Sequence, residues 1–113
     1  MKISGADMSM IRGDTETIAI SCTNSEGNIV PFQIGDKIYF TLKENIYDVE
    51  NILQKVIVEF IEGVAIIELS HDDTKKLRCS TYKYDIRLIQ NHIVITLVPA
   101  ALFMIQREVN KYD

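Results

Sequence analysis

Apolar and polar residues alternate along most of this chain, and a repeat of two residues is typical of half-buried β-strands. The clearest alternation lies in residues 15–23, 37–43, 82–88 and 93–97. One face of each segment is apolar, so we expect these faces to meet in a common core. The residues predicted to form that core are Ile18, Ile20, Ile38, Phe40, Leu42, Val58, Ile67, Leu69, Tyr84, Ile86 and Ile95.

Residues 53–60 and 64–70 are predicted to form the two arms of a hairpin that turns at Glu62-Gly63. A two-residue turn there pairs Phe60 with Ala65, Val58 with Ile67 and Val56 with Leu69. All three pairs are apolar and share one face, which makes the register self-consistent. The opposite face of this predicted hairpin is also partly apolar.

Turn and loop residues separate the first strands. Residues 24–28 contain Gly and Asn and are predicted to turn. Residues 29–32 form an edge strand or a connector, because Pro31 lacks the N–H that a central strand needs. Residues 44–51 are polar and irregular, and they are predicted to form a loop between strands.

The second half of the chain contains one helical signal. Residues 70–77 resemble a single helical turn, with carboxylates near its start and lysines near its end, as the helix dipole prefers. The next two strands are joined by a turn at either Gln90-Asn91 or Asn91-His92, and both choices keep the same face inward. A last strand is expected after Pro99.

The composition supports a β-rich fold. Ile, Val and Thr together make up 33 of the 113 residues, whereas Ala occurs only five times. Branched side chains fit a pleated sheet and are mildly unfavourable in helices. With about seven to eight short strands, the sequence predicts an all-β fold, an immunoglobulin-like antiparallel two-sheet β-sandwich, in one domain spanning residues 1–113. A small β-barrel is the competing architecture.

The charge balance narrows the choice of partners. Twelve Lys and Arg against sixteen Asp and Glu give a net charge of −4, whereas nucleic acids and anionic membranes require a basic surface. We therefore expect no nucleic-acid partner and no membrane partner. The first residues contain no apolar stretch that could act as a signal peptide, so we expect the protein in the cytoplasm of the cell that makes it.

No pattern in the sequence predicts catalysis. The six serines lie outside any nucleophile elbow, the acidic residues alternate outward or lie in loops, and no Gly-rich phosphate loop is present. His71, Asp72 and Asp73 could be metal ligands, but the start of a helix explains this cluster better. We expect no enzyme activity, no catalytic residues, no cofactor and no metal.

Two further motifs have both a structural and a functional interpretation. Arg12-Gly13-Asp14 spells a cell-adhesion tripeptide, but Gly-Asp also suits the start of a strand, and we favour that structural role. Cys22 and Cys79 could form one disulfide, yet free thiols are expected in a reducing compartment.

Some apolar side chains are predicted to point away from the core, in residues 53–70 and in the last strand. Contiguous exposed apolar patches usually mark an interface. The predicted interface residues are Ile57, Ile61, Val64, Ile66, Leu102 and Met104. We predict a closed homo-oligomer, a dimer or a trimer. The alternative is that the loop of residues 44–51 folds over one of the patches.

Several segments together resemble the N-terminal domain of phage baseplate upper proteins of Gram-positive siphophages. The likeness covers roughly residues 8–109 and depends on the order and spacing of its segments. These segments are Arg12-Gly13-Asp14-Thr15, the strand from Lys37 to Lys43, Glu62-Gly63, Ser70 to Thr74 followed by Leu77, Tyr82 to Ile86, and Ala101-x-Phe103-x-Ile105. The resemblance implies an immunoglobulin-like β-sandwich that serves as a building block of the tail tip or baseplate, and it transfers no catalytic residues.

The sequence therefore predicts a non-enzymatic structural protein of a phage or prophage tail. Its expected partners are further copies of itself and other tail proteins, first in the cytoplasm of the bacterial host and then in the virion tail. The alternative is a carbohydrate-binding β-sandwich that uses the exposed aromatics Tyr39, Tyr47 and Tyr82. Tyr82 has a second interpretation, because a Tyr at the start of a late sandwich strand often anchors a corner through its hydroxyl.

Overall fold

The computed structural model describes residues 7–109, and this part of the chain contains nine strands and one short helix. The strands are β1 (Met8–Ile11), β2 (Glu16–Ile20), β3 (Cys22–Thr23), β4 (Ile29–Val30), β5 (Lys37–Lys43), β6 (Leu53–Ile57), β7 (Ala65–Leu69), β8 (Thr81–Gln90) and β9 (Ile93–Gln106). The helix α1 (His71–Thr74) is a single turn. The fold is therefore mostly β, as the alternation of apolar residues predicts.

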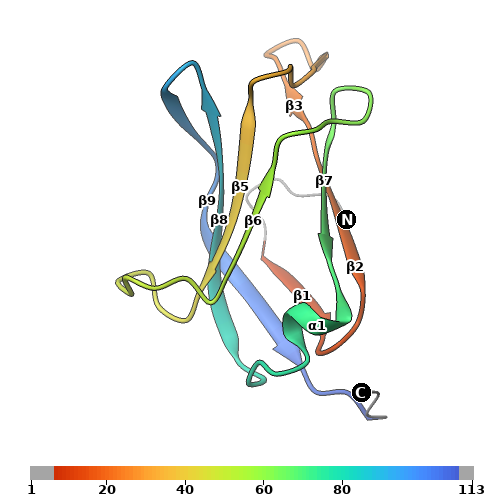
Figure 1. The fold of residues 1–113 in the computed structure, drawn as a ribbon, viewed down its shortest axis with the longest axis vertical. Coiled ribbons are helices and arrows are strands. Elements are labelled where there is room, and N and C mark those ends of the chain that lie inside the picture. The colour runs from red at the N-terminus through yellow and green to blue at the C-terminus, as the bar shows by residue number, and fades with distance from the viewer. Residues whose placement is uncertain (1–6, 110–113) are drawn as a thin grey trace.

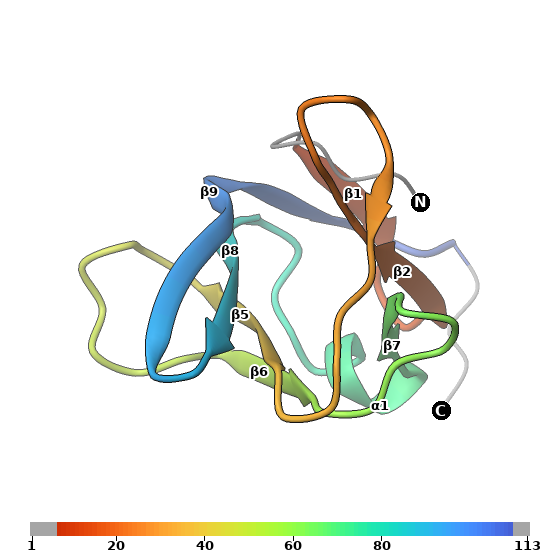
Figure 2. The same cartoon turned by 90° about the horizontal axis from the view of Figure 1, so that it is seen from above.

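Five of the strands form one sheet, in the order β1-β9-β8-β5-β6. β2 pairs with β7, and β3 pairs with β4, in two separate two-stranded sheets. Figures 1 and 2 show β2 and β7 lying across from the five-stranded sheet. The apolar core lies between these two layers, because the inward side chains of both are buried in one cluster.

An aromatic cluster occupies part of this core. The ring centroids of Phe40 and Tyr84 are 5.7 Å apart, and Phe103 lies 6.1 Å from Phe40 and 6.0 Å from Tyr84. Such tilted and edge-on contacts are the arrangements that aromatic pairs prefer. All the predicted core residues are buried except Val58 and Ile95. The predicted core is thus confirmed apart from two positions.

The predicted hairpin of residues 53–70 is wrong except at its tip. β6 pairs with β5, whereas β7 pairs with β2, so the two arms belong to different sheets. A bridge between Ile61 and Val64 remains beside the turn at Glu62-Gly63. Residues 53–60 carry apolar side chains on both faces, so their alternation is compatible with either partner strand.

The change of partner inverts the face of β6 that points inward. Leu53 and Ile57 pack partly against the core, whereas Val56 is exposed. The prediction that Ile57 points away from the core is therefore wrong. Val58 lies beyond the end of β6 and is 53% exposed, so its prediction as a core residue is wrong as well.

β9 is one long strand where the sequence predicts two. Its register against β8 shifts between Tyr84 and Ile86 and again between Ile86 and Arg87, and each shift inserts one extra residue into β9. Pro99 lies in one of these bulges, where its missing N–H breaks no ladder bond. Ile95, before the bulges, belongs to a hairpin tip that stands apart from β2 and β7 in Figure 1. It is 40% exposed, so its prediction as a core residue is wrong.

β1 runs parallel to β9, with Met8 beside Phe103 and Ile11 beside Gln106. The prediction of antiparallel pairing throughout is therefore wrong for this pair of strands. Alternation of apolar residues, here at Met8 and Met10, identifies a buried face but carries no information about strand direction.

The local predictions agree better with the structure. α1 begins after Ser70, whose backbone N–H donates to the carboxylate of Asp73 at 2.7 Å. The β8–β9 turn consists of Asn91 and His92, both with positive φ, which is typical of a type I′ hairpin turn. Residues 44–51 form the predicted loop.

Candidate functional site

The Arg12-Gly13-Asp14 turn belongs to the framework of the fold. The Arg12 guanidinium donates two hydrogen bonds to the Glu108 carboxylate, at 2.6 and 3.0 Å, and one to the carbonyl of Leu77 at 3.3 Å. The hydrogen bonding to Glu108 raises the pKa of Arg12 above its ordinary value. These contacts tie the end of β1 to the chain that follows β9, which supports the structural interpretation of the motif.

Gly13 joins the same turn to α1. Its N–H donates to the hydroxyl of Thr74 at 2.8 Å, and its carbonyl lies 2.7 Å from Nδ1 of His71. A carbonyl oxygen only accepts, so this geometry assigns the imidazole proton to Nδ1. His71 and Thr74 thus hold the helix against the β1–β2 turn.

Asp73 also has a structural role. It accepts from the Ser70 N–H, and its carboxylate lies 2.9 Å from Nζ of Lys55. Burial acts to raise the pKa of Asp73, but the hydrogen bonding from Ser70 and the ion pair with Lys55 outweigh it and hold the pKa below its ordinary value. Among residues 7–109, no group of three or more His, Cys, Asp or Glu side chains is placed to hold a metal ion.

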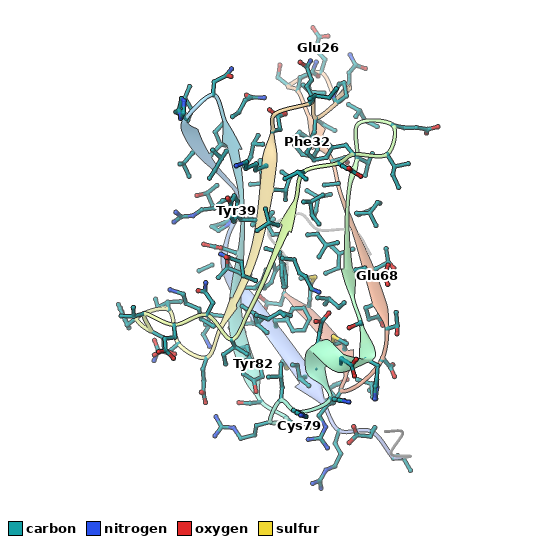
Figure 3. The ribbon with its side chains drawn as sticks, viewed as in Figure 1. Glu26, Phe32, Tyr39, Glu68, Cys79 and Tyr82 are labelled. Atoms are coloured by element: carbon teal, nitrogen blue, oxygen red, sulfur yellow. The ribbon has the colours of Figure 1, made fainter. Side chains whose placement is uncertain are left out.

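The three tyrosines of the carbohydrate-binding alternative have different environments. Tyr82 is buried, and its hydroxyl donates to the carbonyl of Arg78 at 2.6 Å. This confirms the predicted corner and removes Tyr82 from the exposed aromatics. Tyr47 is 86% exposed on the loop of residues 44–51. Tyr39 is half-buried in β5, and Figure 3 shows it on the layer of the five-stranded sheet.

The two cysteines are free thiols, and both are half-buried. Burial, with a smaller contribution from the charge of Asp36, raises the pKa of Cys22. A raised pKa disfavours the thiolate, which is the reactive form of cysteine.

The predicted interface residues lie on different layers of the fold. Their positions are the end of β6 for Ile57, the β6–β7 connection for Ile61 and Val64, β7 for Ile66, and β9 for Leu102 and Met104. Ile61 and Met104 are the most exposed, at 67% and 40%. The others are half-buried. Ile57 packs partly against the core, so an interface built from the other five residues stays a prediction.

Further exposed apolar side chains belong to segments that lie toward the upper end of the fold in Figure 1. They come from β4, from the β4–β5 and β6–β7 connections, and from the tip of the β8–β9 hairpin. We call this surface the apolar end. Its residues, each at least 40% exposed, are Ile29, Val30, Ile34, Val58, Ile61, Ile93, Val94 and Ile95.

Direct contacts hold the segments of the apolar end together. The N–H of Phe32 donates to the carbonyl of Gly63 at 3.0 Å, and the ring of Phe32 lies 5.3 Å from that of Phe60. On the other side, the buried carboxylate of Asp36 lies 3.3 Å from the side-chain amide of Gln90. The β4–β5 connection thus contacts both of its neighbours, and the apolar end is a fixed surface.

Sequence reasoning missed most of the apolar end. A strand with one buried face alternates apolar and polar residues. Consecutive apolar residues beside a turn, as at residues 29–30 and 93–95, therefore indicate that some apolar side chains are exposed. The sequence predicts Val58 and Ile95 in the core, whereas both are exposed.

In the part of the chain that the structure describes, no helix has the length and apolar character needed to cross a membrane. Comparison with known proteins finds no family model that matches this chain and no matching curated protein.

Proposed function

We propose that this protein is a non-enzymatic structural component of a phage or prophage tail, in the baseplate, and that it assembles with itself and with other tail proteins. The exposed side chains of the apolar end carry this proposal, because exposed apolar surface that goes beyond single side chains often marks an interface between proteins. The motifs that resemble baseplate upper proteins support the assignment to a tail. The protein is made in the cytoplasm of the bacterial host and becomes part of the virion.

We infer further that the layers form an immunoglobulin-like β-sandwich. The five-stranded sheet is one layer, and β2 with β7, continued by β3 with β4, is the other. Two observations support this arrangement. Both layers contribute to one buried cluster, and β3 follows β2 after a single residue, Ser21, so the two short sheets extend one another along the chain.

The expected assembly is a closed homo-oligomer, a dimer or a trimer. Burying a large apolar side chain contributes about 1.5–3 kcal/mol, and a half-exposed one contributes roughly half of that. Eight such side chains therefore supply a contribution comparable to the association cost, about 4–15 kcal/mol. A symmetric contact between apolar ends would bury side chains from several of these segments.

Size-exclusion chromatography with light scattering tests the assembly. At micromolar concentration the wild type should have a mass above the 12.9 kDa of one chain. Combining Ile61→Lys with Ile93→Lys should give a monomer, because two charges then enter the contact. Val49→Lys is the control, since Val49 is 94% exposed but lies on the loop of residues 44–51. A monomeric wild type, or a control that dissociates equally, contradicts self-association through the apolar end.

Deleting the gene from the phage or prophage that carries it tests the tail role. Electron microscopy of the resulting particles should show tails without an intact baseplate. Complementation with Val49→Lys should restore the baseplate, whereas the Ile61→Lys and Ile93→Lys double variant should not. Particles with normal tails after the deletion would overturn the proposed function.

A further inference from the structure

A groove runs along β5 and β8 on the outer face of the five-stranded sheet, which is turned away from β2 and β7. It consists of three successive hollows of about 190, 350 and 330 Å³. Neighbouring hollows have lining residues in common, so they form one continuous depression. The first and second share Thr41, Lys43, Asp85 and Arg87, and the second and third share Tyr39 and Ile89.

The register of β5 against β8 brings two lysines together in this groove. Lys43 lies directly opposite Lys83, and both line the first hollow. Like charges at directly opposite positions destabilise a sheet. An anion bound between the two ammonium groups would convert this repulsion into attraction. The Lys43–Lys83 pair is therefore suited to a ligand that carries negative charge.

The bulges of β9 open the sheet beside this pair. The paired positions pass from Tyr84–Ala101 to Ile86–Val98, so the first bulge lies opposite Asp85. Bulges bend a strand and re-aim side chains, and they are enriched next to functional sites. The bulged backbone of β9 therefore helps to shape the first hollow, and Ala100 of β9 lines it.

The charge of the groove is opposite in sign to that of the whole protein. The chain has a net charge of −4. The groove is nevertheless lined by four basic side chains and one carboxylate, which are Lys37, Lys43, Lys83, Arg87 and Asp85. Arg87 and Asp85 form an ion pair at 3.5 Å, so the three lysines supply the excess positive charge. An anionic ligand approaching the protein would therefore be attracted to this face.

Two of the three acidic residues in the neighbouring loop of residues 44–51 have other contacts, and the third is Glu50. Glu44 pairs with Arg78, and the carboxylate of Asp48 accepts from the N–H of Asn45 at 3.0 Å. The backbone carbonyl of Asp48 accepts from Nζ of Lys43 at 2.7 Å, which orients this lysine and leaves its two other N–H donors for a ligand.

The remaining lining suits a sugar. The side-chain amide of Gln54 donates to the hydroxyl of Thr41 at 3.1 Å, and Asn51 and Tyr39 line the same hollow. Amides and hydroxyls can exchange hydrogen bonds with sugar hydroxyls, and an aromatic ring offers an apolar face to the C–H side of a sugar ring. Asp85 can accept from a sugar hydroxyl, but it would repel an uninterrupted row of phosphates.

We propose that this groove binds an anionic oligosaccharide, with an acidic group between Lys43 and Lys83 and a sugar ring beside Tyr39. The groove lies on a sheet face and shares no residue with the apolar end except Val94, so the proposal does not depend on the tail role or on self-association. It limits the carbohydrate-binding alternative to one face of the fold and one class of ligand, and it uses Tyr39 in place of the buried Tyr82.

Isothermal titration calorimetry of the full chain with six-unit probes tests the ligand class. The anionic probes are a heparin-derived hexasaccharide, hexagalacturonate and a phosphodiester-linked sugar hexamer. Maltohexaose is the neutral sugar, and a thymidine hexanucleotide is the anionic probe without pyranose rings. At least one anionic sugar should bind saturably, more tightly than either comparison probe, and its affinity should fall as salt rises.

Charge-removing variants test the position of the site. Lys43→Gln combined with Lys83→Gln should weaken binding of the best anionic sugar by roughly tenfold. The matched control, Lys76→Gln with Arg107→Gln, also removes two positive charges but outside the groove, and it should change affinity by less than about twofold. Tyr39→Ala should weaken the same sugar, while a melting curve shows that each variant is folded.

Three outcomes would overturn the proposal. The first is the absence of binding by all anionic sugars, and the second is equal or tighter binding of maltohexaose or the hexanucleotide. The third is an equal loss of affinity in the groove variant and the control, which would mean unspecific charge attraction. Each outcome leaves the tail proposal unaffected, because self-association and particle morphology test that proposal separately.

Discussion

Gly63 lies so close to Pro31 that no side chain fits between them. A Cβ atom added to Gly63 would lie 2.3 Å from Cβ and 2.9 Å from Cα of Pro31. The φ angle of Gly63 is +77°, in the region that favours glycine. The absence of a side chain therefore allows the β6–β7 turn to rest against the β4–β5 connection, and this contact fixes one side of the apolar end.

Gly63→Ala should lower the free energy of unfolding by more than about 2 kcal/mol, because it adds a steric clash to backbone strain. Gly27→Ala is the matched control. Gly27 has a similar φ of +84° but nothing within 4 Å of an added Cβ, so its substitution should cost only the strain, about 1–2 kcal/mol. Urea denaturation measures both, and equal losses would contradict the role of the contact with Pro31.

Thr74→Val should destabilise the protein by about 1–3 kcal/mol, because the Gly13 N–H then loses its acceptor. The expected drop in melting temperature is about 4–8 °C for each kcal/mol. Thr74→Ser keeps the hydroxyl and should retain most of the stability. A Thr74→Ser variant that melts below Thr74→Val would show that the methyl group of Thr74 matters more than its hydrogen bond.

Tyr82→Phe should cost about 1 kcal/mol, since it removes the hydrogen bond from the buried ring to the Arg78 carbonyl. Tyr39→Phe, at a half-buried position on the outer sheet face, is the comparison and should leave the unfolding midpoint nearly unchanged. Chemical denaturation of both variants checks the difference. A Tyr82→Phe midpoint equal to that of the wild type would argue against the corner.

Stability should depend on the ionisation of Asp73. Because the fold lowers the pKa of this carboxyl, its contribution is fully present above the ordinary carboxyl pKa of about 4. The contribution is lost as the pH falls through the lower pKa of the folded state. Asp73→Asn should therefore be less stable than the wild type at pH 7, and the difference should shrink toward pH 3. A difference that stays constant over this range would show that the charge of Asp73 is unimportant.

Alternation predicts the buried face of a strand well when only one face is apolar. Residues 37–43 illustrate this, because Ile38, Phe40 and Leu42 are all buried as expected. Residues 53–60 have apolar side chains on both faces, so alternation could not distinguish β5 from β7 as the partner of β6. Strand pairing depends on contacts between distant segments, and a periodic pattern within one segment contains no information about them.

The groove likewise depends on strand pairing, which the pattern of a single segment does not reveal. Lys43 and Lys83 are each recognisable in the sequence as outward-facing residues of alternating strands. Their meeting depends on the register between β5 and β8, which brings together residues far apart in the chain. The bulges of β9 that open the sheet beside them have only Pro99 as a local signal.

The parallel pairing of β1 with β9 has a mechanical consequence. If the two ends of the chain were pulled apart, the force on β1 would act at Met8 and the force on β9 would act at Gln106, which are opposite ends of the ladder. Because the strands are parallel, the two forces act along the ladder in opposite directions, and the positions from Met8–Phe103 to Ile11–Gln106 carry the load together. The Arg12–Glu108 ion pair closes one end of this ladder. The fold should therefore resist stretching by shear, whereas terminal strands loaded from one end would open one hydrogen bond at a time.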